Sequence, residues 1–246
     1  MQIAHGIGVD LAYVERGEGP VVLLIHGLAA DALTFAPVLD ALAPHARVIA
    51  YDRRGYGASG APESYEGTTV EEQGEDAVAL LRELGVERAL ICGDGFGALV
   101  ALDLLKRYPA VVGGVVLSDP PLFAFVPAAT EALAKQREAL GRALAEGGPQ
   151  AAVEAWLGGR AEGAALERAR AAHRAFFADY AGLATLALTR AQLRAMAVPV
   201  VVVTDQFSPP VIVAAAERIA ELIPNARRIS DGALTTAALE LVEQAR

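Results

Sequence analysis

Polar residues and glycines directly follow three short apolar runs of this chain, and they are the candidates for chemistry. Residues 26–28 read His-Gly-Leu, residues 52–59 read Asp-Arg-Arg-Gly-Tyr-Gly-Ala-Ser, and residues 93–97 read Gly-Asp-Gly-Phe-Gly. In an open α/β sheet, ligands bind beyond the carboxyl ends of the strands. We therefore expect the three segments to meet at one edge of a sheet and to form one site.

The elements that would position these segments alternate between strand and helix. Strands are predicted at residues 8–16, 20–25, 47–51, 89–92, 115–118, 200–204 and 227–230. Helices are predicted at residues 69–84, 97–108, 210–222 and 235–246. Such alternation predicts an α/β protein with a mostly parallel central sheet and helices on both faces.

The alternation stops at about residue 121 and resumes at about residue 197. The stretch between is rich in Ala, Glu and Arg and carries no strand pattern. It predicts a helical insertion over 121–196 between the two parts of a core domain, 1–120 and 197–246.

The three segments, in this order and spacing, resemble the α/β-hydrolase family. The matching features are His-Gly after an early strand, Asp-x-Arg-Gly-x-Gly-x-Ser after the next, and a strand–Gly-x-x-x-Gly–helix turn. The resemblance covers residues 8–122 and 197–246. It implies the α/β-hydrolase fold, with the insertion as the family's helical cap, or lid, over the site.

The resemblance also locates a missing nucleophile. Gly93 and Gly97 fill the glycine positions of the family's turn, which leaves Gly95 at the nucleophile position. Glycine has no side chain with which to attack. A frame shifted by one residue would make Asp94 the nucleophile, but Phe96 would then occupy a position that must be small.

The general base is missing as well. Ala233 stands where the family has its histidine, and no histidine follows His173. Asp205 stands at the position of the acid, and Asp119 is a second carboxylate at the same edge. Without nucleophile and base, ordinary acyl-enzyme chemistry is disfavoured.

The backbone part of the family's machinery does not depend on those side chains. The resemblance implies an oxyanion hole formed by the N–H groups of Phe96 and a residue near Leu28. Glycine at position 95 suits a turn that needs a positive φ. Around the hole we expect a pocket under the cap, with His26 beside it as the family's usually structural histidine. Its expected aromatic lining is Phe123, Trp156, Phe177 and Tyr180.

Composition excludes several classes of protein. The net charge is −9 and the apparent pI is about 5.0, which argues against nucleic-acid binding. The single cysteine, Cys92, excludes a disulfide framework, and no His, Cys and carboxylate cluster has metal spacing. We expect no cofactor, no membrane association and a cytoplasmic location. The expected partner is a small apolar ligand or substrate.

Three functions remain open. The first is a non-hydrolytic lyase, isomerase or cyclase that binds a carbonyl in the backbone hole. The second is an inactive receptor or carrier for an apolar ligand. The third is a hydrolase whose active site is unusual or has been removed by engineering.

Overall fold

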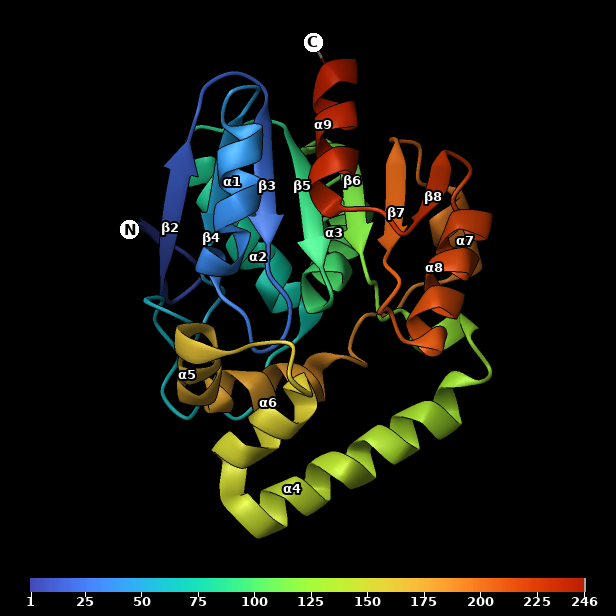
Figure 1. The fold of residues 1–246 in the computed structure, drawn as a ribbon. Coiled ribbons are helices and arrows are strands. Elements are labelled where there is room, and N and C mark those ends of the chain that lie inside the picture. Colours follow the sequence, from blue (N-terminus) through green and yellow to red (C-terminus); the bar gives the residue numbers. More distant parts are fainter. Residues whose placement is uncertain (246) are drawn as a thin grey trace.

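The computed structural model describes residues 1–245 and has one eight-stranded sheet (Figure 1). The strand order is β1-β2-β4-β3-β5-β6-β7-β8. The two pairs β1–β2 and β2–β4 are antiparallel, and every later pair is parallel. The strands are β1 (Gln2–His5), β2 (Asp10–Arg16), β3 (Val21–Ile25), β4 (Arg47–Tyr51), β5 (Ala89–Asp94), β6 (Val112–Ser118), β7 (Val200–Thr204) and β8 (Ala226–Ser230).

Both faces of the sheet are buried, because each central strand sends alternate side chains into two separate apolar cores. In β3, Leu23 and Ile25 join one core, and Val22 and Leu24 join the other. The first core packs against α2 (Val70–Glu83), α3 (Phe96–Arg107) and α8 (Pro210–Leu222). The second packs against α1 (Ala36–Leu42) and α9 (Leu234–Gln244).

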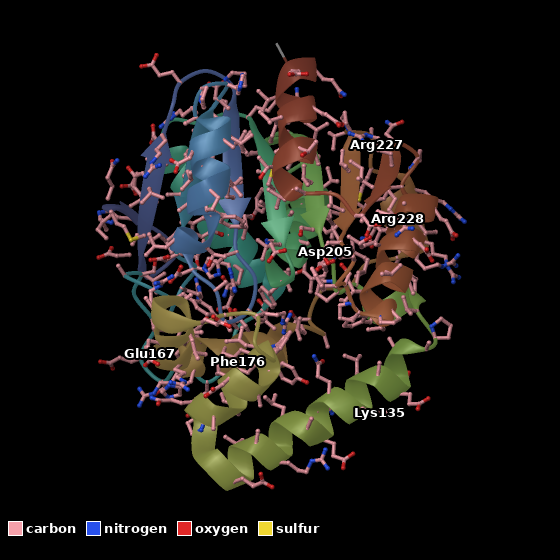
Figure 2. The ribbon with its side chains drawn as sticks, viewed as in Figure 1. Lys135, Glu167, Phe176, Asp205, Arg227 and Arg228 are labelled. Atoms are coloured by element: carbon pink, nitrogen blue, oxygen red, sulfur yellow. The ribbon has the colours of Figure 1, made fainter. Side chains whose placement is uncertain are left out.

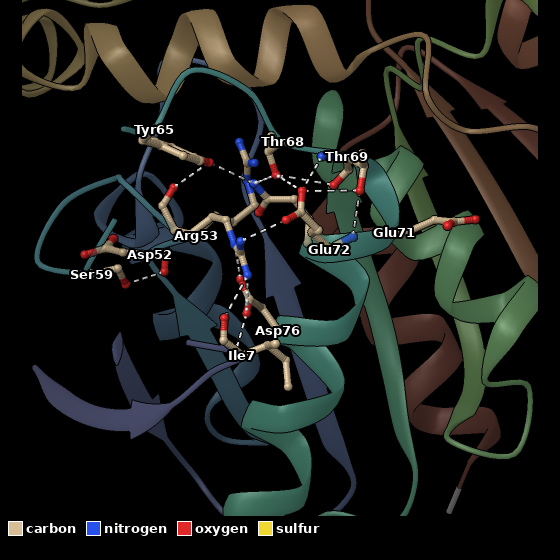
Figure 3. A network of polar contacts seen from close by, with 12 residues as sticks. Ile7, Asp52, Arg53, Ser59, Tyr65, Thr68, Thr69, Glu71, Glu72 and Asp76 are labelled. Atoms are coloured by element: carbon tan, nitrogen blue, oxygen red, sulfur yellow. Dashed lines mark hydrogen bonds and ion pairs between the residues drawn. The ribbon is translucent and has the colours of Figure 1, made fainter. Parts of the chain in front are cut away.

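The loop after β4 is fastened to α2 by polar contacts. Thr69 caps α2 by accepting the N–H of Glu72, whose carboxylate accepts the N–H of Thr69. Arg54 forms a buried ion pair with Asp76, with 2.6 Å between Nε and Oδ2. Figure 3 shows these contacts of Thr69 and Glu72, and the bond from the Ile7 N–H to Asp76. The loop is therefore attached to α2 near both of its ends, at Arg54 and at Thr69.

Three helices of the insertion between β6 and β7 lie beyond the carboxyl ends of the strands (Figure 1): α4 (Ala129–Leu157), α5 (Gly163–Ala171) and α6 (His173–Gly182). The fourth, α7 (Arg190–Arg194), lies beside α8. Helix α4 is kinked at Gly148, where φ is 78° and a proline follows. The last part of the expected insertion packs with the main core through Leu186, Leu188, Leu193 and Met196.

Within residues 1–245, no helix combines the length and the apolar character needed to cross a bilayer.

Candidate functional site

The turn between β5 and α3 is centred on Gly95. This residue has φ 51° and ψ −115°, and it is the N-cap of α3. Its N–H donates to the Ser118 carbonyl over 2.9 Å. Asp94, in contrast, is the last residue of β5. The residue at the apex of the strand–turn–helix is thus the glycine and not the aspartate.

The turn is packed so closely that its other two glycines have no room for a side chain. A Cβ at Gly93 would lie 2.2 Å from the Gly97 carbonyl oxygen, and one at Gly97 would lie 2.0 Å from the Ile25 carbonyl oxygen. At Gly95 the nearest atom to such a Cβ would be the Gly27 Cα, 3.7 Å away. The space above Gly95 is therefore open, whereas the backbone of the turn beneath it packs closely on itself and on β3.

The loop after β3 lies against this turn, because β3 and β5 are neighbours with Ile25 in register with Gly93. The first N–H groups of a helix have no acceptor within the helix. Among the described residues, no protein group accepts the N–H of Phe96 or of Leu28. These two donors are available to a ligand oxygen, and the amino end of α3 favours negative charge near Phe96.

Carboxylates follow the next strands along the same edge. The Asp94 carboxylate accepts a hydrogen bond of 2.8 Å from Ser118, and the Asp119 carboxylate accepts one of 2.6 Å from Ser208. Burial raises the pKa of Asp94 to about 6, against the opposing effect of the Ser118 hydrogen bond. Burial also raises the pKa of Asp119. Near neutral pH, Asp94 can thus both accept and donate a proton.

A cap residue that the sequence did not single out faces these carboxylates. Arg160 follows α4, stacks over the Trp156 ring at 4.6 Å, and donates to the carbonyls of Trp156 and Leu157. Its positive charge opposes the rise in the pKa of both Asp94 and Asp119. The cap therefore brings a cation to the site.

The far end of the edge, beyond β7 and β8, is open. A depression of about 450 Å³ is lined by Asp205, Phe207, Ala233 and their neighbours. Asp205 is exposed, and its carboxylate accepts the Phe207 N–H over 2.7 Å. Figure 2 shows Asp205 beyond the end of β7. Ala233 is the N-cap of α9 and has no side chain with which to bond a ligand.

His26 uses both ring nitrogens inside the protein. Nε2 lies 2.9 Å from the Arg53 N–H and accepts from it, so Nδ1 carries the proton and donates to the Gly27 carbonyl over 2.9 Å. Burial, with the positive charge of Arg53, lowers the pKa of His26 well below its ordinary value. His26 is therefore a neutral residue that organises the loop.

The expected aromatic lining divides into two groups. Phe176 lies at the centre of the cap (Figure 2), with ring centroids at 5.9 Å from Trp156, 5.2 Å from Phe177 and 5.9 Å from Tyr180. These rings form the cap's own small core, and Trp156 and Tyr180 also line a cavity of about 100 Å³. Phe123 packs elsewhere, in a cluster that includes Val126 and residues of α8.

Within residues 1–245, no group of three or more His, Cys, Asp or Glu side chains is arranged to hold a metal ion. The site thus consists of two backbone donors, three acidic side chains and one arginine. Arg160 was not predicted from the sequence, because an arginine in an Ala- and Arg-rich stretch gives no local signal.

Comparison with known proteins agrees with this architecture. A crystal structure of an α/β hydrolase from Sphaerobacter thermophilus is 25% identical, with a TM-score of 0.78, and covers 100% of both chains. The enol-lactonase from Burkholderia xenovorans is also 25% identical, with a TM-score of 0.71, and covers 99% of this chain and 98% of that one.

Curated relatives match over part of the chain. An uncharacterized hydrolase of Bacillus subtilis, YraK, is 37% identical over 115 residues, 47% of this chain and 42% of its own. The 2-(acetamidomethylene)succinate hydrolase of Mesorhizobium japonicum is 34% identical over 155 residues, 62% of this chain and 52% of its own. The chain thus spans about half the length of these relatives, both named as hydrolases. The model of the alpha/beta hydrolase fold family matches residues 20–158, more than half of the chain, so this protein belongs to the α/β-hydrolase fold family.

Proposed function

We propose that this protein is a non-hydrolytic enzyme that moves a proton next to a carbonyl group in a small molecule. One observation carries the proposal: a carboxylic acid whose pKa burial raises to about 6, Asp94, directly precedes the open turn at Gly95. A base of this strength beside a carbonyl site suits enolisation, which underlies isomerase, lyase and cyclase reactions.

The proposed reaction uses only groups of this chain. The substrate carbonyl oxygen accepts the N–H groups of Phe96 and Leu28, and its carbon lies over Gly95 in the space that a nucleophile would fill. The Asp94 carboxylate takes a proton from the carbon next to the carbonyl, and the resulting enolate is stabilised by the two N–H groups. Return of the proton to another carbon completes an isomerisation, and loss of a leaving group completes an elimination.

The charges at the site bear on the expected ligand. Asp94 and Asp119 face one arginine, Arg160, so a free carboxylate group on the ligand would meet net repulsion near them. This supports a neutral carbonyl compound. Leu28 and Ala29, apolar residues of the loop after β3, support a ligand with a hydrocarbon portion, and its apolar character is part of the proposal.

Deuterium exchange tests the proposal directly. The protein is incubated in D₂O with neutral β-diketones and cyclic enones, and incorporation next to the carbonyl is followed by NMR. We expect incorporation with the wild type and a loss of about 10²- to 10⁴-fold in Asp94→Asn, the usual contribution of a general base. Ser208→Ala, which keeps Asp94 intact, is the matched control. Binding of these compounds without exchange would favour a receptor or carrier.

A second candidate is hydrolysis by a water molecule that Asp94 activates. It is favoured by the names of the relatives, which are hydrolases, and by the open space above Gly95, which could hold a water. The water would give a proton to Asp94 as it attacks the carbonyl carbon of an ester or lactone. Incorporation of ¹⁸O from labelled water into the acid product, at rates well above background, would establish this activity and displace the first proposal.

A further inference from the structure

Arg53 joins three parts of the molecule, and the proposed chemistry does not use it. Its side chain is fully buried, with 0% of the residue exposed. The guanidinium lies over two rings, 4.8 Å from the centroid of Phe96 and 4.9 Å from that of Tyr56. Phe96 is the residue that supplies one of the two N–H donors at the site.

The same guanidinium holds the carbonyls of the loop after β3. Nε donates to the His26 carbonyl and Nη2 to the Gly27 carbonyl, each over 2.9 Å. A trans peptide is planar, so its C=O and its N–H point to opposite sides. Because the Gly27 carbonyl points to Arg53, the N–H of Leu28 in the same peptide points away from Arg53.

The third part is the cap. Asp179 of α6 is also 0% exposed, and its Oδ2 lies 2.7 Å from Nη2 of Arg53. The Asp179 carboxylate accepts two further hydrogen bonds, from the Tyr56 hydroxyl over 2.8 Å and from Gln73 Nε2 over 3.1 Å. Burial removes the Asp179 carboxylate from water, and three side chains of the core compensate by bonding to it.

The cap also contacts the other end of the loop after β3. Arg168 of α5 forms an ion pair with Asp31. Between the two attachment points lies Ala29, a buried non-glycine residue with φ 55° that packs against cap residues. A backbone conformation that alanine rarely adopts persists only where its surroundings enforce it.

We propose that Arg53 is a positioning residue, and that seating of α6 through Asp179 fixes the orientation of the Leu28 N–H. Cap docking and assembly of the carbonyl site are then one event. Arg53 suits this role because its planar fork can serve two carbonyls and a carboxylate together, which a lysine ammonium cannot do with the same geometry. The catalytic meaning of this orientation rests on the proposed function, whereas the orientation itself does not.

The test measures the direction of the Leu28 N–H bond by residual dipolar couplings in ¹⁵N-labelled protein. The double variant Arg53→Met with Asp179→Leu removes the whole ion pair, so neither charge is left buried alone. We expect the Leu28 coupling to depart from the value that fits the wild-type structure. The matched control, Arg54→Met with Asp76→Leu, removes another buried ion pair that does not contact the loop, and should leave the Leu28 coupling unchanged.

Two further measurements keep the inference falsifiable if the double variant does not fold. Arg53→Lys retains the charge opposite Asp179 but not the fork, and the Leu28 coupling should change in it too. In the wild type itself, the coupling must fit the N–H axis of the structure, and nuclear Overhauser contacts of the Leu28 amide proton must place that proton on the side away from the Arg53 guanidinium. A misfit in the wild type, or a fit in either Arg53 variant, overturns the proposal. Absence of deuterium exchange would refute the proposed function and leave these couplings untouched, so the two failures are distinguishable.

Discussion

The two ends of the site edge are built in different ways. At the end beside β3 and β5, Gly93 and Gly97 are in close contact with neighbouring backbone, and Arg53 donates to two backbone carbonyls. The groups available to a ligand there are backbone N–H donors. At the end beyond β7 and β8, Asp205 is exposed, Phe207 is 82% exposed, and Ala233 borders an open depression. The contrast suggests that the packed end keeps its geometry without catalytic side chains, whereas the open end depends on side chains that this sequence lacks.

The largest difference between the two ends should appear when one partner of an ion pair is removed. Asp179→Asn leaves the Arg53 guanidinium buried without a counter-ion, and we expect the free energy of unfolding to fall by about 3–5 kcal/mol. Glu240→Gln, an exposed reference away from the site, breaks the pair with Arg227 near the amino end of β8 and should change the free energy of unfolding by less than about 1 kcal/mol. Urea unfolding measures both. Equal losses would contradict the distinction.

Adding one methyl group to a glycine compares the packing at the two ends. Gly97→Ala would press its Cβ against the Ile25 carbonyl, which belongs to a central strand and cannot move, so we expect a loss of about 3 kcal/mol. In Gly232→Ala the Cβ would lie 2.4 Å from Cγ2 and 3.2 Å from Cβ of Ile229, a half-buried side chain of an edge strand, so the side chain must shift but no backbone atom blocks the methyl group. We expect a smaller loss there, about 1–2 kcal/mol. Thermal or urea unfolding of the two variants decides whether the packed end is as rigid as described.

The half-buried carboxyl group of Asp94 at the packed end should make stability depend on pH. Because the pKa of Asp94 is raised to about 6 in the folded protein, folding favours its protonated form, and stability is lost as pH rises from the ordinary aspartate value to about 6. Asp94→Asn removes this loss, so we expect it to raise the free energy of unfolding by up to about 3 kcal/mol near pH 8 and hardly at all near pH 4.

Exposed Asp205 is the matched control at the open end. Asp205→Asn should change the free energy of unfolding by less than about 0.5 kcal/mol at both pH values, because this side chain is exposed and an asparagine oxygen can still accept the Phe207 N–H. A stabilisation of Asp94→Asn that does not vary with pH would show that the Asp94 charge is not the cause.

The smallest effect concerns restored side chains. Gly95→Ser together with Ala233→His should raise turnover of p-nitrophenyl acetate over the wild type by about tenfold, equivalent to about 1.4 kcal/mol. Gly95→Ser alone should not raise the turnover, because no histidine stands opposite the new hydroxyl group. If the double variant is no better than the single one, the open end has lost more than its histidine.

Regular packing patterns made most of the core predictable. The helix at Pro210–Leu222 has the predicted bounds, and strands β4 and β7 do as well. The sequence did not reveal β1, which is a short edge strand with three exposed residues and hence little apolar periodicity. It also missed α1, a helix of seven residues.

Only those parts of the candidate site that are formed by residues close together in the sequence could be predicted. The motif around Gly95 locates the turn because glycine is required by contacts within a few residues and with the adjacent strand. The oppositely charged groups that face Arg53 and Asp94 come from the cap, and no local pattern records that Asp179 or Arg160 will lie near them. Such pairings depend on how the cap helices dock, which tertiary packing decides.

The place at which the cap enters the sheet bears on how such proteins diversify. The chain leaves at the end of β6 and returns at β7, and these two strands are paired neighbours, with Val115 beside Val200. An entire cap could therefore be exchanged as a module without rerouting a strand. An incoming cap would nevertheless have to supply a carboxylate opposite Arg53. This buried charge, with Asp31 opposite Arg168, would act as a compatibility requirement between the two modules.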